Sequence, residues 1–204
     1  MPKLSIVIPV YDMVDYEFFL SRALSSIIQQ TFRDYEILIT RSGKMAENTN
    51  DGIKRASGEL KILFMDDYLA HKNALQDIVD AMGVYQDSGT SQWLITGADT
   101  NPEPEWTDDI VAGNNRLGSP SALTMRTDSA LLFDERMSWL LDCDLYKRLG
   151  DAYGPPLILN QVGVNIGVGN HQMTNILTDE EKLEEHKLIN EKYGEKNKSL
   201  TADV

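Results

Sequence analysis

The chain has 204 residues, of which 42% are hydrophobic and 25% are charged, and its formal net charge is −13. This composition is typical of a soluble globular protein, and the length suits one domain with a full hydrophobic core. The negative charge argues against a nucleic-acid backbone or an anionic membrane as the main partner. A nucleotide is still compatible with it, because a bound metal ion can neutralise phosphate charge locally.

Three features of the sequence concern the compartment. Cys143 is the single cysteine and cannot form an internal disulfide, which indicates a reducing environment. Residues 1–5 lead directly into a strand pattern and have no secretory profile. No apolar stretch approaches the ~18 residues that are needed to span a bilayer. We therefore expect a cytoplasmic protein without a transmembrane segment.

The first half of the chain alternates between strand and helix patterns. Short apolar runs that end in polar or turn residues predict four strands, at residues 4–9, 35–39, 60–65 and 93–96. Apolar residues at helical spacing predict helices between them, at residues 15–28, 45–56 and 74–82. Because strands that alternate with helices pair in parallel, we predict an α/β fold. It consists of a mostly parallel sheet flanked by helices, in a single Rossmann-like domain.

The second half is less regular. Residues 97–119 are rich in Asn, Asp, Gly and Pro and predict a long irregular segment. A strand is expected at 122–126, and a helix at 133–149 that ends at Gly150. Residues 178–181 form a capping box that opens a charged C-terminal helix. Its alternating Glu and Lys residues predict a solvated face.

Two adjacent carboxylates, Asp66 and Asp67, directly follow the third predicted strand. In open α/β sheets, ligands bind outside the carboxyl ends of the strands, which is where this pair lies. The two charges repel each other, and burying them without partners is costly. Mg²⁺ or Mn²⁺ would relieve the repulsion and would complete its coordination with substrate phosphates. The alternative is a solvated turn after a strand.

Six short motifs are informative because of their order and spacing. They lie at residues 5–12, 23–37, 50–53, 56–59, 66–67 and 141–149. Together they resemble glycosyltransferase family 2, the inverting, nucleotide-sugar-dependent enzymes with a GT-A fold. Residues 66–67 fall where that family keeps its metal-binding aspartates. Residues 141–149 are similar to the family's acidic pair, which is followed by a Leu and an Arg-Leu. The resemblance spans roughly residues 4–175.

The resemblance implies a metal-dependent inverting glycosyltransferase of the hexosyltransferase type. Such an enzyme moves a sugar from a nucleotide-diphosphate donor, here a UDP-sugar, to a saccharide acceptor, with Mn²⁺ or Mg²⁺ as the cofactor. On this basis the single domain 1–204 divides into two halves. Residues 1–97 are the nucleotide-binding half, and residues 98–204 are the acceptor half with the C-terminal helix. The oligomeric state is left open.

The resemblance also assigns residues to the metal and the donor. Asp67 is the first choice of metal ligand, and Asp66 shares the metal or contacts the ribose. His171 is a third ligand, unless it is a surface residue of its Gly/Asn-rich loop. Tyr11 and Asp12 flank the nucleotide, because such folds place it at the first loop after a strand. The remaining donor-side residues are Pro9 and Arg41.

Asp142 is the candidate general base, with Asp144 as the fallback. On the predicted helix, Asp142 shares a face with Trp139 and Tyr146, and such rings can stack on a sugar while the carboxylate takes a proton. Burial against the rings would raise the pKa of Asp142 into a range that is useful for base catalysis. The alternative is that both aspartates are surface charges and that Trp139 is a core residue.

Three small residues lie in or beside the candidate site. Gly118 and Ser119 form either a floor under the donor sugar, where glycine allows close approach of the backbone, or an ordinary turn. Cys143 follows Asp142 directly and is expected to be a buried apolar residue rather than a nucleophile.

Two positions depart from the family pattern. The family usually follows its second strand with two aspartates, one of which reads the nucleotide base, whereas this chain has Thr40 and Arg41. Thr49 stands where the family has an arginine. These changes leave the donor base open, together with a second hypothesis, a catalytically silent GT-A-like binding or assembly module. A nucleotidyltransferase is disfavoured, because residues 10–12 are neither glycine-rich nor basic.

Overall fold

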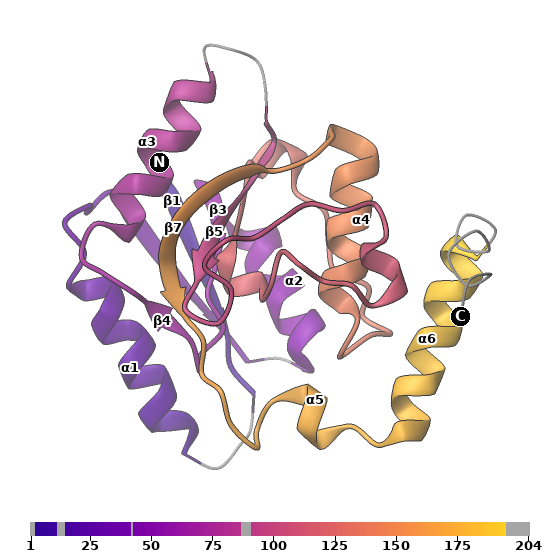
Figure 1. Ribbon diagram of the computed structural model, residues 1–204. Helices are drawn as coiled ribbons and strands as arrows, with labels where there is room; N and C mark the ends of the chain where they lie inside the picture. Colours follow the sequence, from indigo (N-terminus) through magenta and orange to yellow (C-terminus); the bar gives the residue numbers. More distant parts are fainter. Residues whose placement is uncertain (1–2, 12–14, 42, 87–90, 195–204) are drawn as a thin grey trace.

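The computed structural model describes residues 3–11, 15–41, 43–86 and 91–194. In these residues, seven strands form one curled sheet in the order β2-β1-β3-β6-β5-β7-β4, with helices packed around it (Figure 1). The strands are β1 (Leu4–Pro9), β2 (Tyr35–Thr40), β3 (Glu59–Ile62), β4 (Tyr68–Leu69), β5 (Trp93–Ala98), β6 (Leu123–Met125) and β7 (Leu157–Asn165). The helices are α1 (Tyr16–Ile28), α2 (Met45–Arg55), α3 (Ala74–Gln86), α4 (Leu141–Tyr153), α5 (Met173–Ile176) and α6 (Asp179–Tyr193).

Most of these strands run in the same direction. β1 pairs in parallel with β2 and β3, and β5 pairs in parallel with β7. β6 is antiparallel to both β3 and β5, so those two strands also share a direction. The short β4 is antiparallel to β7 at the edge of the sheet. The prediction of an α/β fold with a mostly parallel sheet is therefore confirmed, and the carboxyl ends of the co-directional strands meet at one edge.

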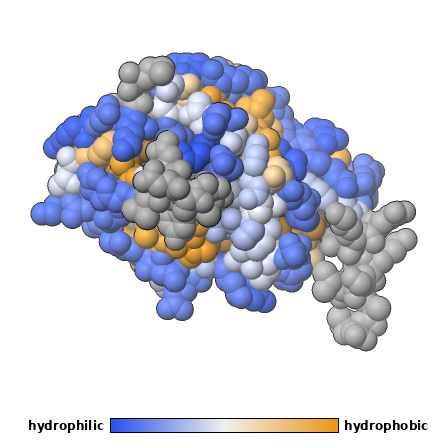
Figure 2. Space-filling model, turned by 90° about the horizontal axis from the view of Figure 1, so that it is seen from above, coloured by the Kyte–Doolittle hydropathy of each residue, from blue (hydrophilic) through white to orange (hydrophobic). Residues whose placement is uncertain are grey.

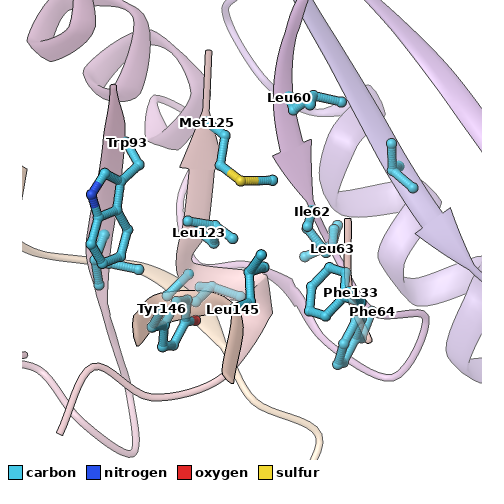
Figure 3. Packing of buried hydrophobic residues seen from close by; sticks show 14 of the residues in the cluster. Leu60, Ile62, Leu63, Phe64, Trp93, Leu123, Met125, Phe133, Leu145 and Tyr146 are labelled. Carbon is cyan, nitrogen blue, oxygen red and sulfur yellow. The ribbon is translucent and has the colours of Figure 1, made fainter. Parts of the chain in front are cut away.

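The apolar runs of the sequence form the centre of the sheet. All six residues of β1 and all six of β5 are buried, as expected for strands that are covered on both faces. Figure 3 shows side chains of β5 and β6 packing against α4, with Leu145 beside Leu123. Trp93 stacks on Tyr146, with ring centroids 5.8 Å apart. This packing holds α4 against the sheet and so positions the residues at its start.

Several predicted element ends differ from the structure, and two of the differences have a clear physical cause. β3 ends at Ile62 rather than at residue 65, because the Phe64 N–H donates to the Ser121 hydroxyl (2.8 Å) instead of to a neighbouring strand. The helix that was expected to end at Gly150 continues past it. A Cβ at Gly150 would lie 2.3 Å from the Trp106 ring, so glycine here allows the ring to pack against the helix.

One predicted helix start is also wrong. The helix expected from residue 133 begins at Leu141. The backbone N–H groups of Ser138, Trp139 and Leu140 donate to the carboxylate of Glu185 in α6. A side-chain acceptor thus competes with helical hydrogen bonding just before α4.

The surface seen in Figure 2 is mostly hydrophilic, with hydrophobic side chains in small separate patches. Within the described ranges, no helix combines the length and the apolar character needed to cross a bilayer. One side of α6 packs back on the domain, with Glu185 6% exposed and Ile189 1% exposed. The predicted solvated face is present on the other side of the helix, where Glu184 and Lys187 are exposed, and Glu185 is the exception among the charged residues.

Candidate active site

An open pocket of about 150 Å³ lies at the carboxyl edge of the co-directional strands. Tyr11 lines it from the segment after β1, and Asp66 and Asp67 line it from the segment after β3. Trp139 and Asp142 line it from the start of α4. The sheet topology brings together residues that are far apart in the sequence, at the position where open α/β sheets bind their ligands.

Asp66 lies at the centre of a polar cluster in this pocket. Its Oδ2 is 3.0 Å from Nε2 of His171, and the same nitrogen is 2.9 Å from the carbonyl oxygen of Gly167. Burial and the charges of Asp66 and Asp67 raise the pKa of the nearby Tyr11 hydroxyl. Burial raises the pKa of Asp66, and its hydrogen bonds together with the nearby His171 oppose this rise. The predicted third ligand, His171, therefore lies beside Asp66 rather than beside Asp67.

Asp67 is enclosed more deeply. It is 2% exposed, its Oδ1 accepts a 2.8 Å hydrogen bond from the Gly167 N–H, and its Oδ2 lies 3.4 Å from the Ser119 hydroxyl. Burial and the charge of Asp66 raise the pKa of Asp67 to about 7. Burial lowers the pKa of Lys61 to about 7, and the attraction between Lys61 and Asp67 opposes that shift. The two aspartates thus form a buried acidic pair, and the alternative of a solvated turn is wrong.

The donor atoms of this pair suit a divalent cation that arrives with its substrate. Among the described residues, no group of three or more His, Cys, Asp and Glu side chains is arranged to hold a metal ion by itself. Mg²⁺ and Mn²⁺ are commonly held by one or two carboxylates together with substrate phosphates. Both oxygens of Asp67 already have hydrogen-bond partners. Asp66 Oδ2 also has a partner, Nε2 of His171 (3.0 Å), so the side chains of Asp66 and His171 can approach one ion together.

Asp142 lies in the first turn of α4 and lines the pocket. Its Oδ2 accepts a 2.8 Å hydrogen bond from the side-chain amide of Asn115, and its Oδ1 accepts a 2.7 Å bond from the backbone N–H of Cys143. Burial raises the pKa of Asp142 to about 6, and these hydrogen bonds limit the rise. Such a carboxylate is ionised yet still basic at neutral pH, which suits a general base. Burial also raises the pKa of the Cys143 thiol, which keeps it protonated.

Asp144, the fallback base, is not among the residues that line the pocket. Its carboxylate is fully buried and is bound by Arg148 (2.7 Å), by Lys192 and by the hydroxyl of Tyr193 (2.8 Å). Lys192 and Tyr193 belong to α6, so Asp144 ties α4 to α6. Its contacts indicate a structural role.

Asp144→Asn is expected to destabilise the fold without changing the pocket. The substitution leaves Arg148 and Lys192 facing an uncharged group, and breaking a buried ion pair costs about 3 kcal/mol or more. For a chain of this size, that loss lowers the melting temperature by roughly 10 °C. Scanning calorimetry checks the result. A melting temperature equal to that of the wild type would show that Asp144 does not tie the two helices together.

Of the predicted aromatic residues, Trp139 lines the pocket and Tyr146 does not. Tyr146 is fully buried against Trp93, and its hydroxyl donates to the carbonyl oxygen of Gly118 (3.2 Å). Its predicted position beside a sugar is therefore wrong. Gly118 has a φ of +90°, a backbone conformation that favours glycine, and Ser119 follows it into the lining of the pocket.

The residues predicted to bind the donor follow the ends of β1 and β2. Pro9 is the last residue of β1, and Tyr11 lines the pocket two residues later. Arg41 comes directly after β2, and its guanidinium carbon is 4.6 Å from the centroid of the Tyr16 ring. Asp12 lies outside the described residues.

Two contacts of the site are not indicated by any motif in the sequence. Asn115 binds Asp142 from the irregular segment, across 27 positions of the chain. Glu185 binds the backbone at Trp139 from 46 positions away. The capping box identifies α6 as a helix, but it does not indicate which glutamate of α6 is buried.

No family model matches the sequence, and no curated protein matches it. Several solved structures share its fold. Residues 1–349 of S. aureus TarS superpose with a TM-score of 0.62 at 17% identity, over 99% of this chain and 66% of that chain. The same protein in complex with UDP-GlcNAc gives 0.66 at 17% identity, over 99% and 68%. The longer TarS structure gives 0.62 at 16% identity, over 99% and 40%.

This chain therefore spans about two thirds of the shorter TarS structures and 40% of the longer one. At such low identity, the likeness establishes the fold, and the predicted GT-A-type α/β architecture is confirmed. Membership of glycosyltransferase family 2 stays a prediction.

Proposed function

We propose that this protein is a glycosyltransferase that moves a sugar from a nucleotide-diphosphate donor to a hydroxyl of a saccharide acceptor, with inversion. The observation that carries the proposal is the convergence of Asp66, Asp67 and Asp142 on one pocket at the carboxyl edge of the sheet. The similar structures are of TarS, a glycosyltransferase, and include complexes with UDP and with UDP-GlcNAc. They favour a UDP-sugar as the donor.

The donor diphosphate would bind beside Asp66 and His171. These two residues, with Asp67, would hold Mn²⁺ or Mg²⁺, which would neutralise negative charge on the leaving diphosphate. Asp67 also accepts a hydrogen bond from the Gly167 N–H and so keeps the segment after β7 against the site. Tyr11, which lines the pocket together with Asp66, would contact the nucleotide at the end of β1.

Asp142 and Trp139 would form the acceptor side. An acceptor hydroxyl oxygen attacks the anomeric carbon from the face opposite the diphosphate, so a new C–O bond forms as the sugar–phosphate bond breaks. Asp142 takes the proton of that hydroxyl, while Asn115 and the Cys143 N–H hold its carboxylate in place. A positioned base of this kind typically contributes ~10²–10⁴-fold to the rate.

The nucleotide base is expected to be recognised weakly. Thr40 stands where the resembling family has an aspartate, and its buried hydroxyl donates to the carbonyl oxygen of Asn48 (2.7 Å). A site that hydrogen-bonds the correct group can reject analogues by about 10⁴-fold, whereas we expect UDP and CDP affinities within about tenfold of each other. Competitive titration measures the ratio. A uridine preference of several powers of ten would show that another residue reads the base.

Calorimetric titration with UDP, CDP, GDP and TDP, each with and without Mn²⁺, tests the donor half of the proposed function. We expect at least one of these diphosphates to bind, and Mn²⁺ to strengthen that binding. If none of the four binds under either condition, the pocket is not a nucleotide-sugar site and the proposed function is wrong.

A further inference from the structure

Three side chains of α6 surround Trp139. Glu185 binds the backbone N–H of Trp139, and the His186 ring meets the Trp139 ring edge-on with centroids 5.3 Å apart. Nζ of Lys182 lies 5.7 Å from the centroid of the Trp139 ring. Positions 182, 185 and 186 are three and four residues apart and therefore share one face of the helix. This face of α6 contacts a residue that lines the candidate active site.

The Glu185 carboxylate makes more of these contacts than the other two side chains. Its Oε1 accepts hydrogen bonds from the backbone N–H groups of Ser138 (2.7 Å) and Trp139 (3.2 Å). Its Oε2 accepts from those of Trp139 (2.9 Å) and Leu140 (2.8 Å). Hydrogen bonds to an ionised acceptor are stronger than neutral ones, and an anion is favourable before the N-terminus of a helix. The carboxylate thus fixes the backbone that carries Trp139 and leads into α4.

The far end of α6 is anchored as well. Lys192 and Tyr193 bind the buried Asp144 of α4, and Ile189 is packed in the core. In Figure 1, α6 lies on the outer side of α4 and is joined to β7 through α5. Because both ends of the helix are held, α6 can present Glu185 to the start of α4 in one fixed position.

We propose that Glu185 is a positioning residue for the acceptor side of the pocket, acting through Trp139 and the start of α4. The assignment of an acceptor sugar to Trp139 rests on the proposed function, whereas the hydrogen bonds of Glu185 do not depend on it. Glu185 does not line the pocket itself. Its loss should therefore weaken acceptor binding and leave donor binding unchanged.

Glu185→Gln tests this role, because it replaces one accepting oxygen with an NH₂ group that faces other N–H donors. The acceptor KM should rise about tenfold, which corresponds to 1.4 kcal/mol. UDP affinity should change by less than about threefold, because Glu185 does not line the pocket. Glu184→Gln is the matched control, since Glu184 is exposed and pairs only with Lys187 in the described structure. It should behave like the wild type.

Hydrogen exchange supplies a readout that needs no substrate. The amides of residues 138–140 should exchange at least about tenfold faster in Glu185→Gln and at the wild-type rate in Glu184→Gln. Unchanged exchange in Glu185→Gln would overturn the inference. Faster exchange with an unchanged acceptor KM would also overturn it, because the hydrogen bonds would then be structural only. If the wild type transfers no sugar, the proposed function and the acceptor role fall together, whereas the exchange result still reports on the hydrogen bonds.

A second variant covers the case in which Glu185→Gln does not fold. Glu185→Asp keeps the charge and withdraws the carboxylate by one methylene from the N–H groups of residues 138–140. It should raise the acceptor KM and leave UDP affinity unchanged. A wild-type KM in Glu185→Asp would show that the position of this carboxylate does not matter to the acceptor, and it would overturn the inference.

Discussion

Asp142→Asn is expected to lower the rate of sugar transfer by at least ~10²-fold, with nucleotide and metal affinity retained. Asparagine keeps an oxygen that can accept from Asn115, but it cannot take a proton from the acceptor. Only the ionised carboxylate is a base, and burial raises the pKa of Asp142 to about 6. The wild-type pH–rate profile should therefore fall on its acid side near pH 6. The residual activity of Asp142→Asn should lack this limb.

The same substitution is expected to stabilise the folded protein at neutral pH. The pKa of Asp142 is raised from 3.8 to about 6 on folding, so its ionisation opposes folding. The penalty is absent below about pH 4 and complete above about pH 6, where it reaches at most about 3 kcal/mol. The NH₂ group of the new asparagine faces the Cys143 N–H, so the gain at pH 7.5 in urea denaturation should be smaller than this penalty, and it should disappear at pH 3.5.

Asp144→Asn is the matched control for Asp142→Asn, two positions along the same helix. It should lose stability and keep the activity of the molecules that remain folded, which is the opposite result on both readouts. If Asp142→Asn were fully active and Asp144→Asn inactive, the general base would be Asp144 and not Asp142.

Asp66→Asn is expected to remove the effect of Mn²⁺ on UDP affinity. Loss of a residue that only orients a metal ligand typically costs 10–100-fold in affinity, so loss of the ligand itself should cost at least about tenfold. The metal-free variant should melt no lower than the wild type, because the substitution removes one of two repelling buried charges. Titration calorimetry with and without Mn²⁺, together with scanning calorimetry, measures both effects.

The companion variant Asp67→Asn distinguishes the role of Asp67 from that of Asp66. Asp67 accepts hydrogen bonds from Gly167 and Ser119, so its substitution should loosen the segment after β7 and keep a measurable Mn²⁺ effect. The sequence analysis has Asp67 as the first metal ligand, and that order stays a prediction; because Asp66 contacts His171, we propose Asp66 as the first ligand instead. If Asp67→Asn abolished the Mn²⁺ effect and Asp66→Asn preserved it, the original order would stand.

The features that the sequence predicted well have local causes. The buried strands β1 and β5 are continuous apolar runs, which indicate a parallel sheet wherever helical patterns alternate with them. Residues that follow such strands must meet at one edge of the sheet. For that reason the sequence alone predicts that Tyr11 lies in one pocket with the pair Asp66 and Asp67.

The features that it predicted poorly depend on contacts between distant residues. Tyr146 has helical spacing from Asp142. Its ring nevertheless lies in the core, because it stacks on Trp93, which is 53 positions earlier in the chain. The start of α4 is shifted because Glu185 binds the N–H groups that precede it. Glu185 itself lies in a run of charged residues that resembles any solvated helix. No local pattern distinguishes a glutamate that will be buried from its exposed neighbours.

The most direct test of the central claim is the fate of the sugar when the wild-type protein meets a nucleotide-sugar, Mn²⁺ and a panel of saccharide acceptors. The donor is the one whose nucleotide binds in the calorimetric titrations, and proton NMR identifies the product and its anomeric configuration. We predict a new glycoside with inverted configuration and release of the nucleoside diphosphate. A retained configuration would contradict the single displacement assisted by Asp142. If the protein binds a nucleotide but neither transfers nor hydrolyses any sugar, the proposed transferase activity is contradicted. The protein would then be a binding module.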